Sequence, residues 1–143
     1  MLRAETSVVI NRPAEDIEAF LNDLDNQSQW ISGYIEMRSL TEGPLRPGYK
    51  YLDVRQTLGR RLESTVEITE YVPNQSRSFK TTEGPTSWEA TLTLESVEGG
   101  TRVNYTIEGE TKGIFKLADA IVARIIQRQV ETDFINLKDL LEA

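Results

Sequence analysis

The sequence contains neither cysteine nor histidine among its 143 residues. Without cysteine, disulfide bonds and a thiol nucleophile are excluded, and the composition fits a reducing compartment. Without histidine, the chain lacks the usual general base, the commonest protein ligand for metals and any Ser-His-Asp triad. Catalysis by this chain would therefore need other side chains.

Long apolar runs are also missing. No run approaches the roughly eighteen apolar residues of a membrane span, and Met1–Glu5 lack the apolar core of a signal peptide. The 16 basic residues are outnumbered by 23 acidic ones, and the net charge of −7 argues against a nucleic-acid partner. Neither a phosphate-binding glycine loop nor metal-ligand spacing is present. These absences predict a soluble cytoplasmic protein without cofactor, metal or membrane span, and we expect a monomer or weak homodimer.

The end of the chain predicts one long helix. The segment Ile114–Glu142 has no proline and no internal glycine, and its apolar residues recur at helical spacing: Ala118, Ile121, Val122, Ile125, Ile126, Val130, Phe134, Leu137 and Leu141. A shorter helix is predicted over Pro13–Leu24, because Pro13 suits a first helical turn and the apolar residues share one face. The chain is long enough for a single domain, residues 1–143, with its own core.

Alternating apolar and polar residues predict strands with one buried face. These strands are Glu5–Asn11, Tyr49–Thr57, Leu62–Tyr71, Ser87–Val97 and Arg102–Glu108. Three strands show the alternation most clearly. The inward residues are Leu62, Ser64, Val66 and Ile68 in the strand Leu62–Tyr71, and Trp88, Ala90, Leu92 and Leu94 in the strand Ser87–Val97. In the strand Arg102–Glu108 they are Val103, Tyr105 and Ile107. This order of elements predicts an α+β fold, and a long helix against a curved antiparallel sheet often leaves a cavity between them.

The strand Tyr49–Thr57 departs from this pattern, because neither of its faces is cleanly apolar. Tyr51, Asp53 and Arg55 share one face. Two interpretations are open: an edge strand whose polar face meets solvent, or a strand whose polar face lines a partly polar cavity.

Several short motifs, in order along the chain, resemble the START-like superfamily, also called SRPBCC. The resemblance is strongest to its polyketide cyclase/dehydrase branch and spans essentially the whole chain. The motifs are Ile10–Asp23 (INRPAEDIEAFLND), Trp30, Gly48, Val66–Pro73 (VEITEYVP), Gly100–Val103 (GTRV), Gly113 and Leu137–Glu142 (LKDLLE).

The resemblance implies a helix-grip fold, in which a curved antiparallel sheet of about seven strands wraps around the long C-terminal helix. Two short helices would follow the first strand. The cavity would be lined by the inner sheet face and the inner stripe of the last helix. When the inward-facing positions are carried over strand by strand, the resemblance implies a set of ligand-binding residues. They are Tyr51, Asp53, Arg55, Leu62, Ser64, Phe79, Thr81, Trp88, Ala90, Tyr105, Ile125 and Gln129.

We expect this cavity to bind a small, largely hydrophobic ligand that is lipid-, aromatic- or polyketide-like. One alternative is a polyketide cyclase, aromatase or dehydratase-like enzyme that uses Arg55, Asp53 and a tyrosine in the same cavity. A second alternative is an interaction module with a collapsed cavity and no ligand. No catalytic constellation of the family's enzymes maps onto this sequence, so whether the protein is an enzyme stays open.

Overall fold

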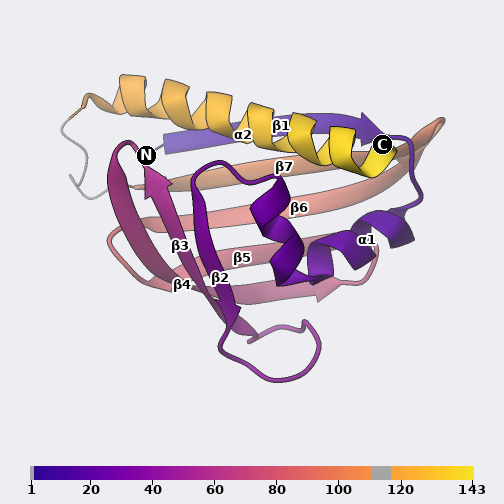
Figure 1. The fold of residues 1–143 in the computed structure, drawn as a ribbon, viewed down its shortest axis with the longest axis horizontal. Coiled ribbons are helices and arrows are strands. Elements are labelled where there is room, and N and C mark those ends of the chain that lie inside the picture. Colours follow the sequence, from indigo (N-terminus) through magenta and orange to yellow (C-terminus); the bar gives the residue numbers. More distant parts are fainter. Residues whose placement is uncertain (1, 111–116) are drawn as a thin grey trace.

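The computed structural model describes residues 2–110 and 117–143. Seven antiparallel strands form one curled sheet in the order β1-β7-β6-β5-β4-β3-β2, with a long helix lying against it (Figure 1). The elements are β1 (Leu2–Ile10), α1 (Ala14–Asn22), the 3-10 helix η1 (Leu24–Gln29), β2 (Tyr34–Ser39), β3 (Lys50–Thr57), β4 (Arg60–Val72), β5 (Ser76–Glu83), β6 (Ser87–Val97), β7 (Gly100–Glu110) and α2 (Asp119–Glu142). The predicted α+β helix-grip architecture is confirmed.

Both predicted helices are shorter than expected. Ala118 is extended (φ −61°, ψ 144°), so α2 begins at Asp119, whose carboxylate suits a helix N-terminus. The predicted residues 114–116 lie outside the described part of the chain. The first helix ends at Asn22 because Asp23 is extended and its side chain accepts a hydrogen bond from the Asp25 N–H (3.0 Å), which starts a separate 3-10 turn.

The strand with polar faces lies inside the sheet. β3 is hydrogen-bonded to β2 on one side and to β4 on the other, so the interpretation as an edge strand is wrong. Tyr51 and Asp53 are buried, and Arg55 is half-buried. The predicted alternation in the neighbouring strands is confirmed, since Val66 and Ile68 are buried, as are Ala90, Leu92 and Leu94 in β6 and Val103 in β7.

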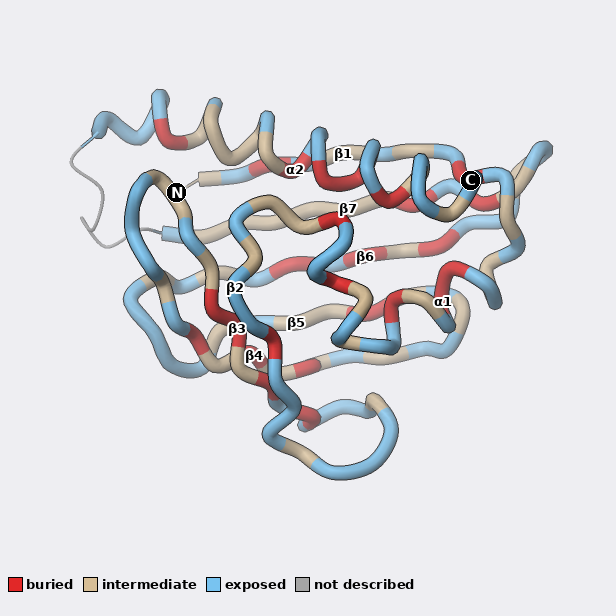
Figure 2. Tube along the Cα trace, in the orientation of Figure 1, coloured by how far each residue is buried: buried red, intermediate tan, exposed pale blue. Residues whose placement is uncertain are grey.

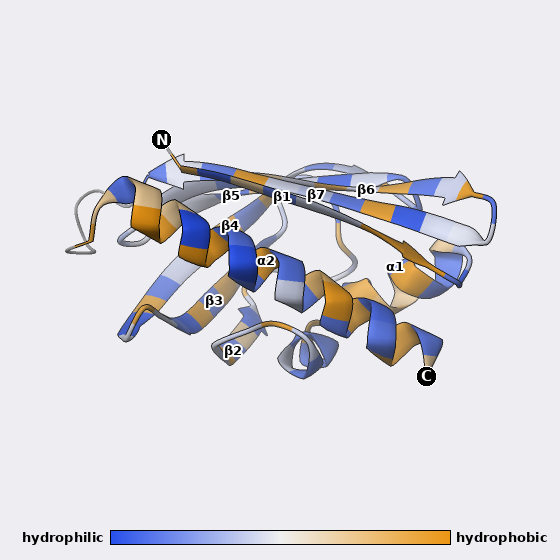
Figure 3. Cartoon of the chain, turned by 90° about the horizontal axis from the view of Figure 1, so that it is seen from above, coloured by the Kyte–Doolittle hydropathy of each residue, from blue (hydrophilic) through white to orange (hydrophobic). Residues whose placement is uncertain are grey.

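The helix α2 runs along β1, an edge strand of the sheet (Figures 1 and 3). The Gln127 amide bonds both backbone groups of Glu5, accepting from its N–H at 3.0 Å and donating to its C=O at 2.8 Å. Lys138 Nζ donates to the Val9 carbonyl at 2.7 Å. Helix side chains thus occupy backbone groups that an edge strand would leave free, and this pairing covers the edge.

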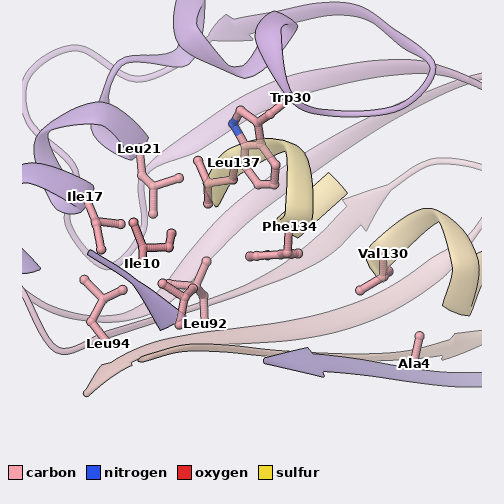
Figure 4. Packing of buried hydrophobic residues seen from close by; sticks show 11 residues of the cluster. Ala4, Ile10, Ile17, Leu21, Trp30, Leu92, Leu94, Val130, Phe134 and Leu137 are labelled. Carbon is pink, nitrogen blue, oxygen red and sulfur yellow. The ribbon is translucent and has the colours of Figure 1, made fainter. Parts of the chain in front are cut away.

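The hydrophobic core packs beneath α2 and extends to α1 and the sheet. Val130, Phe134 and Leu137 point from the helix toward the sheet and α1 (Figure 4). The buried positions of α2 lie on the side that faces the rest of the molecule (Figure 2). Trp30, which follows η1, packs its ring edge-to-face against Phe134 with 5.2 Å between ring centroids. This packing fixes one end of α2.

A buried ion pair attaches α1 to the β4–β5 hairpin. The Arg77 guanidinium donates to the Glu18 carboxylate, and both side chains are at most 10% exposed. Glu18 also accepts hydrogen bonds from the Tyr71 hydroxyl (3.1 Å) and the Asn74 backbone N–H. Arg77 donates in addition to Asn22 Oδ1 at 2.8 Å. Every charge brought into this interface therefore has partners, as burial requires.

Replacing Glu18 with alanine should destabilise the protein by roughly 3–5 kcal/mol, because it leaves the Arg77 guanidinium buried without its carboxylate. Urea unfolding measures this free energy. The matched control is Glu15→Ala, an exposed carboxylate one turn earlier on the same helix, for which we expect a loss below about 1 kcal/mol. Equal losses in the two variants would mean that the ion pair does not hold α1 in place.

Candidate functional site

A cavity of about 250 Å³ lies between α2 and the concave face of the sheet. This volume is just under the roughly 300 Å³ at which pockets for drug-sized ligands begin. Its walls come from β3, β4, β5, β6 and β7, from η1 and from α2. The predicted cavity is therefore present, and its size suits a small molecule.

A row of aromatic rings crosses the cavity from the sheet to the helix. Phe79 meets Trp88 edge-to-face at 6.0 Å and Tyr105 at 6.4 Å between centroids. Tyr105 in turn lies 4.9 Å from Phe134, which contacts Trp30. These spacings are those of favourable aromatic pairs. The row gives the cavity a continuous apolar wall.

The polar part of the cavity is built around Asp53 and Arg55 on β3. Arg55 Nε donates to Asp53 Oδ1 at 2.9 Å, and Arg55 Nη2 donates to Oδ2 at 3.0 Å. The Asp53 side chain is 5% exposed and that of Arg55 is 34% exposed. Burial alone would lower the pKa of Arg55, but the Asp53 charge and its hydrogen bonds raise it above the ordinary value. The guanidinium is therefore held charged and in one orientation.

Further polar atoms around this pair have no protein partner. Arg55 Nη1, the hydroxyls of Tyr51, Ser64 and Tyr105, and the Gln129 amide make no hydrogen bond to another described residue. In the described part of the chain no fully buried side-chain nitrogen or oxygen lacks a hydrogen bond. These atoms are therefore solvent-accessible, and all five residues line the cavity.

Both tyrosines remain protonated at neutral pH. Burial, with the nearby Asp53 charge, raises the pKa of Tyr51 well above its usual range. Burial also raises the pKa of Tyr105 to about 12, although Arg55 acts in the opposite direction. Their hydroxyls can accordingly donate hydrogen bonds to a bound molecule, and they are poor general bases.

A second carboxylate, Asp133, enters the cavity from α2. Its Oδ1 accepts hydrogen bonds from the Ser32 backbone N–H (2.9 Å) and from the Ser32 hydroxyl. The next residue, Gly33 (φ 70°), packs closely on β3, because a Cβ at that position would lie 2.2 Å from the Gln56 carbonyl oxygen. Burial raises the pKa of Asp133, while the Ser32 hydrogen bonds and the Arg55 charge oppose the shift.

Most residues of the predicted site meet at this cavity. The structure places nine of them in its lining: Tyr51, Asp53, Arg55, Leu62, Ser64, Phe79, Trp88, Tyr105 and Gln129. Three others lie outside it: Thr81, Ala90 and Ile125.

Each of these three residues has a local reason for lying outside the cavity lining. Ala90 is paired with Phe79 and Ile107, whose larger side chains line the cavity around its methyl group. Thr81 Oγ1 accepts a hydrogen bond from the Trp88 backbone N–H at 3.0 Å, near the end of β5. Ile125 is displaced around the helix from the lining stripe, where Ile126 lies instead.

Sequence reasoning missed several lining residues. Trp30, which the sequence offers only as one of the family's motifs, lines the cavity. Asp133 follows the polar Gln129 by one helical turn and precedes the buried Leu137 by another. Gln129 and Asp133 are both polar residues within the apolar stripe of the helix, so the pattern that suggests Gln129 as a cavity residue suggests Asp133 as well. Nothing in the sequence indicates its partner Ser32.

The described residues contain no group of three or more acidic side chains that could hold a metal ion. In that same part of the chain, no helix is long and apolar enough to cross a membrane.

Replacing Asp53 with alanine should destabilise the protein by about 3 kcal/mol, the lower end for breaking a buried pair, because the cavity lets water reach Arg55. Arg55→Ala should cost more, since it leaves the deeply buried Asp53 carboxylate without a counter-charge. The control is Glu67→Ala, which breaks the partly exposed Lys50–Glu67 pair and should cost at most about 1 kcal/mol. Urea unfolding orders the three variants, and a negligible effect of Asp53→Ala would contradict a buried pair.

The Asp133→Asn variant should gain stability relative to the wild type as the pH rises from about 4 to 7. Burial raises the pKa of Asp133 above the unfolded value of about 3.9. While the carboxyl is protonated in both the folded and the unfolded state, it does not lower the free energy of unfolding. Once it is ionised in both states, the folded protein bears the full cost of the buried charge. Asparagine removes the charge and keeps an acceptor for Ser32. Thermal unfolding across this pH range measures the difference. A difference that does not change with pH would show that Asp133 ionises in the fold without cost.

The sequence and the structure were compared with known proteins. A family model described as polyketide cyclase / dehydrase and lipid transport matches residues 1–142. Comparison with curated protein sequences gives no match.

Solved structures share the fold at low identity. A START superfamily protein from Mycobacterium smegmatis is 13% identical, covers 99% of this chain and 98% of its own, and has a TM-score of 0.83. The protein TTHA0849 from Thermus thermophilus is 21% identical over 97% and 96% of the two chains, with a TM-score of 0.83. A conserved protein from Geobacillus kaustophilus is 16% identical over 98% and 95%, with a TM-score of 0.77. The match over nearly the whole chain, together with this fold, shows that the chain belongs to the polyketide cyclase/dehydrase and lipid transport family of START-like proteins.

Proposed function

We propose that the protein binds a small, largely hydrophobic molecule in the cavity beneath α2. One observation carries the proposal: an oriented guanidinium with unpaired N–H donors lies in a wall that is otherwise mostly apolar. Such a combination is typical of ligand pockets, in which apolar contacts supply affinity and a few polar groups fix orientation.

The apolar part of the ligand would lie along the aromatic row. Phe79, Tyr105 and Phe134 present ring faces and edges to the cavity, and stacking on them suits a planar or polyketide-like molecule. Membership of the family supports a hydrophobic ligand of this kind.

The polar part of the ligand would meet Arg55. Asp53 holds Nε and Nη2 and leaves Nη1 directed to the accessible space. The neighbouring Tyr51 hydroxyl is a second donor. A ligand oxygen placed between them would receive hydrogen bonds from groups that need no rearrangement, and this preorganisation favours binding.

A cyclase- or dehydratase-like reaction in the same cavity is the second candidate. It is favoured by the same donors, because Arg55 and the tyrosines could stabilise negative charge on an enolate oxygen. Asp133 is the group whose raised pKa suits proton transfer. The third hypothesis, a module without a ligand, assumed a collapsed cavity, and the structure has an open one.

N-phenyl-1-naphthylamine, a neutral apolar fluorophore, should bind the wild-type protein and change its tryptophan emission, because Trp30 and Trp88 both line the cavity. Trp88→Leu should lose part of that change and keep the binding. Gln129→Phe should fill the cavity and weaken binding by at least about tenfold, since Gln129 lines it from α2. The matched control is Arg128→Phe at the neighbouring exposed position, which should bind normally. If Gln129→Phe binds as tightly as Arg128→Phe, the probe occupies another site and the proposal fails.

A further inference from the structure

The charges around the cavity do not cancel. Asp53 neutralises Arg55, and Glu18 neutralises Arg77, which also lines the cavity. Asp133 has no Lys or Arg within ion-pair distance among the described residues. In the described part of the chain, the cavity lining therefore carries one carboxylate without a counter-ion.

Among the described residues, the other charged groups of the lining do not supply that counter-ion. Arg3 lines the cavity, but it is paired with Glu5 and Glu108 and is largely exposed. Glu110 also lines the cavity and is an exposed acidic residue.

One oxygen of Asp133 faces the cavity. Both hydrogen bonds from Ser32 go to Oδ1, and no described residue donates to Oδ2. Because no fully buried polar atom in the described part of the chain lacks a partner, Oδ2 must be accessible, and Asp133 belongs to the cavity lining. The residue is only 8% exposed, so this opening is small. Oδ2 is a strong acceptor that awaits a donor.

The cavity therefore offers opposite polarity on two walls. Arg55 presents N–H donors from β3, and Asp133 presents an acceptor from α2. They are close enough for the Arg55 charge to influence the ionisation of Asp133. A ligand carboxylate at Arg55 would add a second negative charge beside Asp133 in a poorly hydrated space, and like charges there repel strongly.

We propose that Asp133 makes the cavity selective for uncharged ligands that carry a hydrogen-bond donor beside their carbonyl acceptor, such as hydroxy-ketones or amides, over carboxylates. This inference rests on the proposed binding function and narrows its ligand class. The carbonyl would accept from Arg55, and the donor would bond Asp133 Oδ2.

Three naphthalene probes separate the contributions of charge and donor. 2-Naphthamide is neutral with acceptor and donor, methyl 2-naphthoate is neutral with acceptors alone, and 2-naphthoate is an anion. At neutral pH the amide should bind wild type most tightly and the anion at least about tenfold more weakly than the amide. Calorimetric or fluorescence titration gives the three affinities.

The variant Asp133→Asn should remove most of this discrimination, chiefly by improving the affinity for 2-naphthoate. The matched control is Asp139→Asn, which removes the same charge from an exposed position of the same helix and should keep the wild-type ratio. If 2-naphthoate binds wild type as tightly as the amide, or if Asp133→Asn leaves the ratio unchanged, this inference is overturned. If neither these probes nor N-phenyl-1-naphthylamine bind wild type, the proposed function itself fails and the inference fails with it.

A measurement on wild type alone provides a second test should Asp133→Asn fold poorly. Binding of 2-naphthoate should be accompanied by proton uptake, and binding of the amide should not. Among the described residues, the polar and charged groups near Asp133 are Ser32 from the η1–β2 connection, Arg55 from β3 and Tyr105 from β7, and the cavity also holds Asp53 and Tyr51. The tyrosines are already protonated at neutral pH, so Asp133 is the acceptor of that proton. Calorimetry in two buffers of different ionisation enthalpy detects the uptake, and equal proton uptake for the two probes contradicts the proposal.

Discussion

The position of α2 over the β1 edge is the constraint on which the rest of the structure depends. Gln127 and Lys138 bond backbone groups of β1, which holds the helix to one side of the curled sheet. A helix about 10 Å wide cannot fill the concave face from there. Toward the C-terminal end of α2, Leu137 and the core around it complete the packing. Beneath residues 123–134 of the helix, space stays open and forms the cavity.

Open space beside a curled sheet changes which residues its inner face can carry. A close-packed core would exclude Asp53, Arg55 and Asp133, because a buried charge without hydrogen bonds is costly. Here Asp53 pairs with Arg55, Ser32 bonds Asp133, and the remaining polar atoms reach the cavity. The polar groups are thus tolerated because they lie where a bound molecule could contact them. Their fixed positions would determine which hydrogen-bonding groups of a ligand the cavity favours.

The sequence predicts the parts of this structure that depend on local periodicity. Alternation placed Val66 and Ile68 in the core, and helical spacing identified α2. Local periodicity could not decide whether Arg55 meets solvent or a cavity. The position of Arg55 depends on the pairing of β2 with β3, and β2 has no clear alternation. The contact of Asp133 with Ser32 joins residues about a hundred positions apart through a turn at Gly33. Pattern reasoning has no access to such a contact.

The central claim is that a ligand lies between the aromatic row and Arg55. Intermolecular nuclear Overhauser effects in a complex with 2-naphthamide test it most directly. We predict contacts from the ligand ring protons to Phe79, Tyr105 and Phe134, and from the amide group to the Arg55 guanidinium protons. Contacts confined to residues on the outer face of the sheet, with none to these four side chains, would contradict the account.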